Sequence, residues 1–172
     1  RLKAGMVPEA RALAGSRELL ANALVMRRQY AEAVREFEAM QSGLDTDREL
    51  AERLPPGNRS WALALMRTGR APEAIAMLEP IVARTGERVG ASHYSTAEAR
   101  GFLAMALAAD GQHERALQEF SAAIPVLLQR RPRDSGVGVS AVARAQRVAM
   151  ILEAYVRLLF DLRDTRPSAA GG

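Results

Sequence analysis

The sequence predicts an all-α fold: a right-handed superhelical array of antiparallel helical hairpins with a C-terminal capping helix. Three observations predict it. Alanine, the best helix former, occurs 33 times, whereas the β-branched and aromatic residues typical of strands are sparse. Glycine and proline divide the chain into segments of helical length, and none of these shows the alternation of a strand. A pattern of small and large residues recurs every 41 or 42 residues, which is typical of stacked helical hairpins.

Length and composition exclude several classes of protein. The 172 residues suffice for one domain with a sizeable core, and 48% of them are apolar. The formal charge is +4, and a charged fraction of 26% is ordinary for a folded protein. The absence of cysteine excludes disulfides, thiolate nucleophiles and cysteine-ligated zinc, and two histidines exclude a histidine-rich metal site. No apolar run approaches the roughly 20 residues that span a bilayer.

Four helices are expected in the first part of the chain, over about residues 8–28, 30–41, 45–54 and 58–67. Pro8 suits a first helical turn and would open the first of them. Ser42-Gly43 is expected to end the second. The acidic residues at 45–47 can cap a short third helix, and the fourth would end at Thr68-Gly69.

Four more helices are expected after residue 70. Three cover about residues 72–84, 95–110 and 140–163, and one begins near residue 112 and ends before a loop at 131–138. Pro80 and Pro125 lie inside two of them, and Pro80 should kink its helix because proline lacks an N–H. Ser95 and Glu98 have the spacing of a capping box, which would begin the second of this set. The last helix presents an apolar stripe of Val148, Ile151, Leu152, Tyr155, Leu158, Leu159 and Leu162, with Glu153 and Arg157 on the opposite face.

Three segments share one register. Ala33, Ala74 and Ala116 are 41 and 42 residues apart, and each precedes a large apolar residue by four positions. A small turn residue comes five positions before the alanine in two segments, Gly69 and Gly111, whereas the first has Arg28. When the three segments are aligned in this way, three upstream pairs also fall into register: Leu20-Ala21, Trp61-Ala62 and Leu103-Ala104. We interpret the alanines as small residues at helix crossings, separated by turns that need positive φ.

This register resembles the tetratricopeptide repeat family, in its long variety of about 42 residues. The third segment is most similar, because residues 90–99 carry His93 and Thr96 where the long variety commonly has His and Thr. The first unit departs at Arg28 and the second at Ala71, where a tyrosine is usual. The resemblance implies repeats at about 16–54, 57–94 and 95–131 and a capping helix at 140–163. Together they would form one domain over residues 1–163, followed by a linker at 164–172.

The C-terminal part is similar to the last helix before the caspase-like protease domain of bacterial CHAT proteins. The likeness rests on residues 134–138 and 147–159. In that family the catalytic His and Cys lie in the protease domain, and no residue of this chain matches them. The chain begins at Arg1 and reads as a piece of a longer bacterial protein, whose regulatory or recognition arm it would be.

The tetratricopeptide resemblance also implies a binding groove lined by the first helix of each hairpin. Carried onto this sequence, its candidate peptide-binding residues are Asn22, Met26, Arg59, Leu63, Met66, Arg67, Glu98 and Met105, beside Glu18 and Ala109. Methionine adapts to a ligand's shape and arginine binds carboxylates, so such a groove could hold a peptide. The alternative is that the methionines pack between hairpins and the arginines only solvate the surface. Glu18 stands where relatives that bind chaperone tails have a lysine, which disfavours a carboxylate clamp.

Other polar residues have simpler interpretations. His93 is expected to fix the loop before its helix through a local hydrogen bond, and His113 to pack in an aromatic position. The basic residues at 130–133 suit a solvated helix end, and no aromatic platform accompanies them that would favour nucleic acid.

The sequence therefore predicts a non-catalytic protein–protein interaction module, with no cofactor and no metal. Its partner would be a protein or peptide, including the alternative of an adjacent domain of the same polypeptide. Regulation of a CHAT protease domain is the alternative function, and self-association through the terminal hairpins is a weaker one. Nucleic acid and membrane are disfavoured as partners, and a cytoplasmic location is favoured.

Overall fold

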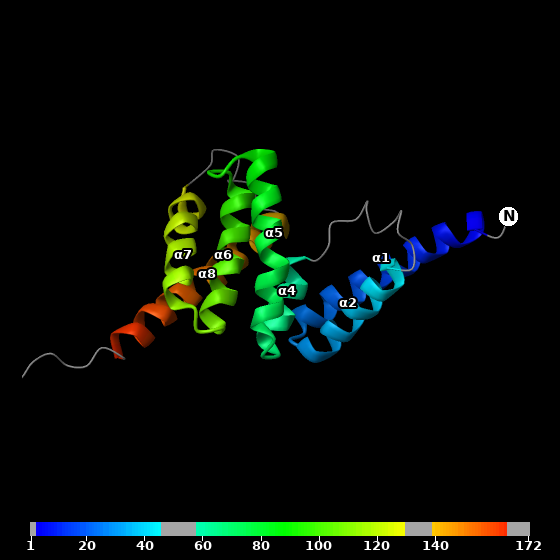
Figure 1. Ribbon diagram of the computed structural model, residues 1–172, viewed down its shortest axis with the longest axis horizontal. Helices are drawn as coiled ribbons and strands as arrows, with labels where there is room; N and C mark the ends of the chain where they lie inside the picture. Colours follow the sequence, from blue (N-terminus) through cyan, green and yellow to red (C-terminus); the bar gives the residue numbers. More distant parts are fainter. Residues whose placement is uncertain (1–2, 46–57, 130–138, 165–172) are drawn as a thin grey trace, which may run out of the picture. The chain divides into compact units, whose positions relative to one another are not determined.

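The computed structural model describes residues 3–45, 58–129 and 139–164 of the chain. These residues form seven helices and no strand, which confirms the all-α prediction (Figure 1). The helices are α1 (Lys3–Met26), α2 (Tyr30–Asp45), α4 (Arg59–Arg67), α5 (Ala71–Val89), α6 (Tyr94–Ala109), α7 (His113–Leu128) and α8 (Val139–Asp164). Apart from Asp45, the short helix expected at 45–54 lies outside the described residues, as do the loop at 131–138 and nearly all of the linker at 164–172.

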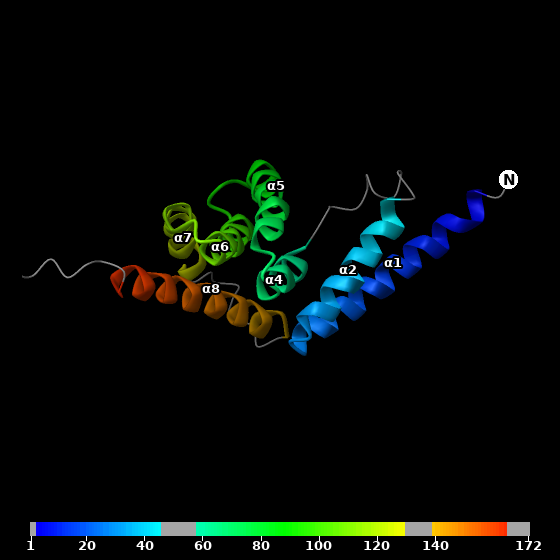
Figure 2. The ribbon, with the colours of Figure 1, turned by 60° about the horizontal axis from the view of Figure 1, so that its bottom comes forward.

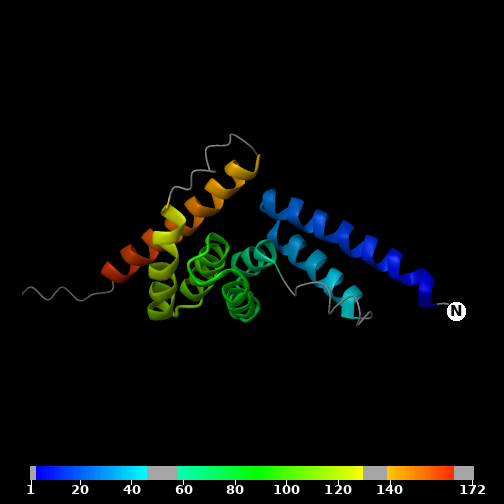
Figure 3. The same ribbon diagram turned by 90° about the horizontal axis from the view of Figure 1, so that it is seen from above.

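The chain divides into two compact units, Arg1–Leu78 and Glu79–Gly172, and the division falls inside α5. In the first unit α1 and α2 form a hairpin, and α4 packs against both helices. In the second unit α6 and α7 form a hairpin, and α8 packs against both (Figures 2 and 3). Neighbouring helices therefore pack in sequence order, as in a helical solenoid of the tetratricopeptide type.

The three predicted turns share one backbone geometry. Arg28, Gly69 and Gly111 have φ values of 61°, 78° and 78°. In each turn the next residue donates its N–H to the carbonyl five positions back, at 2.9 Å: Gln29 to Leu24, Arg70 to Leu65 and Gln112 to Leu107. This hydrogen bond and the left-handed residue define a Schellman motif, which ends a helix by satisfying its last carbonyls. Arg28 thus occupies the glycine position with the same conformation, although it has a side chain.

Replacing Arg28 with glycine should stabilise the first unit by about 0.5–1 kcal/mol, because the left-handed conformation strains a residue that has a Cβ. The matched controls are Gly69→Ala and Gly111→Ala. An added methyl at either glycine would meet nothing within 4 Å, so a loss of about 1 kcal/mol there would reflect the backbone alone. Denaturant unfolding followed by circular dichroism measures all three variants. An Arg28→Gly protein no more stable than the wild type would contradict the argument.

The core repeats with the same register as the turns. The small residues of the predicted pattern are completely buried, and so are the large apolar residues four positions after the second alanine of each hairpin. Each has a relative exposure of 0%: Ala21, Ala62, Ala104, Ala33, Ala74, Ala116, Phe37, Leu78 and Phe120. A small side chain lets two helices approach closely, and the large one fills the space beside it. The aligned positions are therefore equally buried in all three segments.

One predicted helix start and two predicted helix ends are wrong. Helix α1 begins at Lys3, so Pro8 lies inside the helix and does not open it. Helix α2 continues through Ser42-Gly43 to Asp45, and α5 continues through Thr85-Gly86 to Val89. A single glycine lowers helix stability by only about 1 kcal/mol, so tertiary packing can override it. Thr85 is buried, and a Cβ on Gly86 would lie 3.7 Å from Thr96 Cγ2, so this part of α5 packs against the start of α6. The helix ends instead at Gly90, whose φ is 95°.

The predicted capping box of α6 is also wrong. The helix begins at Tyr94 with His93 as its N-cap, and His93 Nδ1 accepts a hydrogen bond of 3.1 Å from the Ser95 N–H. This confirms the local role expected for His93. The Thr96 hydroxyl donates to the Gly90 carbonyl at 2.8 Å, which ties the preceding loop to the helix. Glu98 is 3% exposed, and its Oε1 accepts a hydrogen bond of 2.7 Å from Arg147 Nε of α8.

Helix α8 docks on α6 and α7 through part of its predicted stripe. Ile151 is 0% and Leu158 3% exposed, and the Tyr155 ring lies 5.2 Å from the Phe120 ring. Leu159, which the stripe places inward, is instead 42% exposed. Glu153 and Arg157 are exposed, as predicted. The two buried residues, Ile151 and Leu158, are seven positions apart, which is about two helical turns. Only a narrow line of α8 therefore faces the hairpin.

Candidate peptide-binding surface

Helix α4 is fixed at its start by Asn58. The Asn58 Oδ1 accepts from the Trp61 N–H at 2.8 Å, which caps the helix, and Asn58 Nδ2 donates to Glu18 Oε1 at 3.2 Å. Glu18 belongs to α1, so one side chain begins α4 and holds it against its neighbour. The Glu18 carboxylate, which the sequence analysis listed beside the candidate groove residues, thus binds Asn58.

The candidate residues of α4 lie on one side of the helix. Arg59, Leu63, Met66 and Arg67 are separated by four, three and one positions, whereas Trp61 and Leu65 lie on the opposite side. Leu63 is 9% exposed and Met66 is half-buried. Arg59 is half-buried and Arg67 is exposed. This side of α4 therefore combines a buried apolar centre with charged ends.

Helix α1 brings two further candidates to the first unit. Asn22 is half-buried, and Met26 is 85% exposed, so it does not pack between hairpins as the alternative interpretation required. The hairpin of α1 and α2 is joined by Arg17 Nη1 and Glu36 Oε2 at 2.9 Å. Because α1 packs against α4, Asn22 and Met26 stand on the helix next to that of Arg59 and Leu63.

The other two candidates lie on α6, in the second unit. Glu98 is 3% exposed and bound to Arg147 of α8, and Met105 is 8% exposed. Both contribute mainly to the packing of their own unit. Ala109, at the end of the same helix, is exposed.

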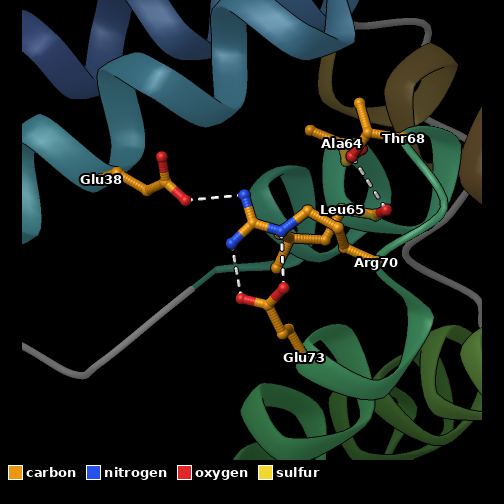
Figure 4. A network of polar contacts seen from close by, with 6 residues as sticks. All are labelled: Glu38, Ala64, Leu65, Thr68, Arg70 and Glu73. Carbon is orange, nitrogen blue, oxygen red and sulfur yellow. Dashed lines mark hydrogen bonds and ion pairs between the residues drawn. The ribbon is translucent and has the colours of Figure 1, made fainter.

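A network that the sequence analysis missed surrounds Arg70, the residue before α5. Arg70 Nη1 donates to Glu38 Oε1 at 2.7 Å, and its Nε and Nη2 donate to the two oxygens of Glu73 (Figure 4). The hydrogen bonds that Arg70 donates to Glu73 and, second, to Glu38 raise the pKa of the Arg70 guanidinium, and the hydrogen bond that Glu73 accepts from Arg70 lowers the pKa of Glu73. Thr68 closes the turn beside it, because its hydroxyl contacts the carbonyl oxygens of Ala64 and Leu65. The Arg70–Glu73 spacing is visible in the sequence, but the contact with Glu38, 32 residues away, is not.

The second unit has a depression of about 410 Å³ between α6, α7 and α8. Its wall includes Leu127, Val148 and Leu152, and the Arg144 guanidinium lies 4.9 Å from the centre of the Tyr94 ring.

Within the described ranges, no group of three or more His, Asp or Glu residues could hold a metal ion. His113 is the half-buried first residue of α7. Over those same ranges, no helix is both long and apolar enough to cross a bilayer.

Residues 58–129 match the model of the tetratricopeptide repeat family. The match covers α4 to α7 and supports a tetratricopeptide repeat domain in this part of the chain, in agreement with the register of the buried alanines. Members of this family are non-catalytic modules that generally mediate protein–protein interactions. Neither the curated proteins nor the solved structures include one that matches the chain.

Proposed function

We propose that this chain is a non-catalytic protein–protein interaction module of a larger bacterial protein, which binds a peptide or protein segment along the first helices of its hairpins. The observation that supports it most is the match of residues 58–129 to a family of such modules. The surface of α4 described above supplies the chemistry, with Arg59 and Arg67 at i and i+8 around the apolar Leu63 and Met66.

Two guanidinium groups on one side of a helix favour an acidic segment. Arginine donates to both oxygens of a carboxylate, and eight residues separate the two groups by about two helical turns, or about 12 Å. Charge contacts at exposed positions contribute little energy, so the apolar contacts with Met66 and Met26 would carry much of the affinity. The charges would mainly set the specificity and the rate of association.

Changing both arginines of α4 to alanine should weaken binding of acidic peptides by roughly two- to tenfold at low salt, and by less at moderate salt. The comparison uses an array of capped peptides that contain Asp or Glu, each paired with its Asn or Gln version. The matched control is Arg35→Ala/Arg84→Ala, which removes the same charge from two exposed positions elsewhere. Equal binding by the Arg59→Ala/Arg67→Ala protein and the control would place the acidic site elsewhere.

The alternative proposal is that the chain regulates an adjacent CHAT protease domain. It is supported by the docking of α8, because a domain joined to that helix would be coupled to the α6–α7 hairpin that holds Ile151 and Arg147. Reading the coding sequence beyond residue 172 distinguishes the two proposals. A His/Cys protease domain directly downstream supports regulation, and an unrelated domain there contradicts it.

A further inference from the structure

Helix α1 presents a row of exposed leucines on the side that faces away from its buried alanines. Leu13 is 57%, Leu19 74% and Leu20 49% exposed, and Ala23 on the same side is exposed as well. These four residues are called the leucine face of α1 below. Contiguous apolar surface of this kind on a folded protein indicates an interaction site.

The leucine face carries no charge. A helix at the surface of a protein normally has charged residues on its outer side. Between residues 13 and 26, α1 has two charged residues, Arg17 and Glu18. Arg17 binds Glu36 of α2 at 2.9 Å, and Glu18 accepts from Asn58 Nδ2 at 3.2 Å, so both are engaged with the other helices of the unit.

The repeat register shows what kind of surface belongs on this face. Leu20 aligns with Trp61 and Leu103, which are 8% and 4% exposed, whereas Leu20 is 49% exposed. The Trp61 ring stacks on Phe37, with 5.4 Å between ring centres, and Phe37 lies on α2, the second helix of the hairpin before α4. The position of Leu20 is therefore one at which a hairpin buries apolar surface against a neighbouring helix.

Successive hairpins of this chain are also joined by an ion pair. Arg70 Nη1 lies 2.7 Å from Glu38 Oε1, and Arg115 Nη2 lies 2.8 Å from Glu79 Oε1. Glu38 and Glu79 are 41 residues apart and occupy the same place in the second helix of their hairpins. In both cases the arginine belongs to the start of the second helix of the following hairpin.

The first hairpin lacks the cation for such an ion pair. Gln29 stands at the position of Arg70, and Glu32 stands at the position of Arg115. Gln29 Nε2 donates to Glu32 Oε2 at 3.2 Å, so the two residues bind each other. The leucine face therefore has the apolar surface of a junction without its ion pair, which favours a partner other than one more hairpin in the same register.

We propose that the leucine face of α1 binds the same face of a second copy of this chain across a two-fold axis. A two-fold interface brings one patch against itself, so a charged patch would face charges of its own sign. An uncharged face avoids that repulsion and buries leucines from both copies. Leu13 and Asn22 are nine residues apart and lie on opposite sides of α1, so the dimer would leave the candidate peptide-binding surface accessible.

Sedimentation velocity of the whole chain tests the proposal. Over about 1–200 μM protein we expect a monomer–dimer equilibrium, because self-association follows mass action. A chain that sediments as a monomer throughout this range would overturn the proposal, and the leucine face would then be left for a different protein segment to cover.

Variants show whether the dimer uses α1. Leu13→Glu/Leu19→Glu would place four carboxylates in the two-fold interface, so it should raise the dimer dissociation constant at least about tenfold. Leu13→Ala/Leu19→Ala removes apolar contacts without adding charge and keeps the helix propensity of α1, so it should also weaken the dimer. The matched control is Val156→Glu/Phe160→Glu, at positions of α8 that are 48% and 57% exposed, and it should dimerise as the wild type does.

A circular dichroism melt of each variant in dilute solution checks that it is folded. If both α1 variants dimerise as the wild type does, or if the α8 control loses as much dimer as they do, self-association uses another surface and the proposal fails. The peptide-binding proposal is tested separately. Leu13→Ala/Leu19→Ala should bind acidic peptides normally, and Arg59→Ala/Arg67→Ala should still dimerise.

Discussion

A Gly101→Ala protein is expected to lose about 1–2 kcal/mol of unfolding free energy, although alanine is the better helix former. A Cβ at Gly101 would lie 2.6 Å from Ile151 Cδ1, 3.0 Å from Cγ2 and 3.1 Å from Cγ1. Ile151 is 0% exposed and β-branched, so it has no free space into which to turn. Helix α8 must therefore shift away from α6. Overpacking costs typically about 1–3 kcal/mol, and the gain in helix propensity of about 1 kcal/mol offsets part of it.

Shortening the opposing side chain should reveal the same contact. Ile151→Ala alone leaves a cavity and should cost about 2–5 kcal/mol. In the double variant the methyl group added at position 101 enters space that the isoleucine vacated, so the loss should fall short of the sum of the single losses by about 1 kcal/mol or more. Gly15→Ala and Gly43→Ala are the matched controls. Both glycines lie inside helices with nothing within 4 Å of an added Cβ, so both changes should stabilise by about 0.5–1 kcal/mol.

Denaturant unfolding of the four single variants and the double variant measures the cycle. If Gly101→Ala is as harmless as Gly43→Ala, then α8 does not dock on α6 at this position. It would then have to be regarded as part of a neighbouring domain. Additive losses in the double variant would lead to the same conclusion.

The sequence predicted the repeated features well because they are local. A positive φ in a turn and a completely buried alanine recur at fixed offsets, so Gly69, Gly111, Ala74 and Ala116 each indicate their environment. Arg28 shows why the register is more informative than the residue type. It breaks the glycine rule and still adopts the turn, because the helices on both sides of it are held together by their own packing.

Features set by contacts distant in sequence could not be predicted. Glu98 had the spacing of a capping box, but its partner Arg147 is 49 residues away, and the cap is supplied by His93. The helix predicted over 72–84 stops before Thr85-Gly86 because nothing in the sequence indicates that Thr96 packs beside Gly86. The depression of about 440 Å³ that Glu38 and Trp61 help to line was missed for a related reason. Trp61 and Glu38 come from different hairpins, and only the fold brings them to one wall.

The surface of α6 illustrates a further limit of periodicity. Eleven of its residues are buried, on every side of the helix, from Thr96 to Leu107. An amphipathic pattern identifies which side faces the core only when another side faces water. The position of Met105 in a groove was therefore an inference from family register. Its 8% exposure shows a side chain that is mostly surrounded by its own unit.

Leucine in place of Ala74 or Ala116 should destabilise the protein by about 1–3 kcal/mol each, because both alanines are 0% exposed and a core at native density has no room for three more carbon atoms. Ala76→Leu and Ala122→Leu are the matched controls, in the same helices α5 and α7 but at exposed positions. Those two should remain within about 0.5 kcal/mol of the wild type, because alanine and leucine differ little in helix propensity. The contrast between neighbouring positions separates packing from any general effect of added apolar surface. Melting midpoints from circular dichroism decide it: if all four variants melt together, the alanines do not mark helix crossings and the 41–42-residue register is wrong.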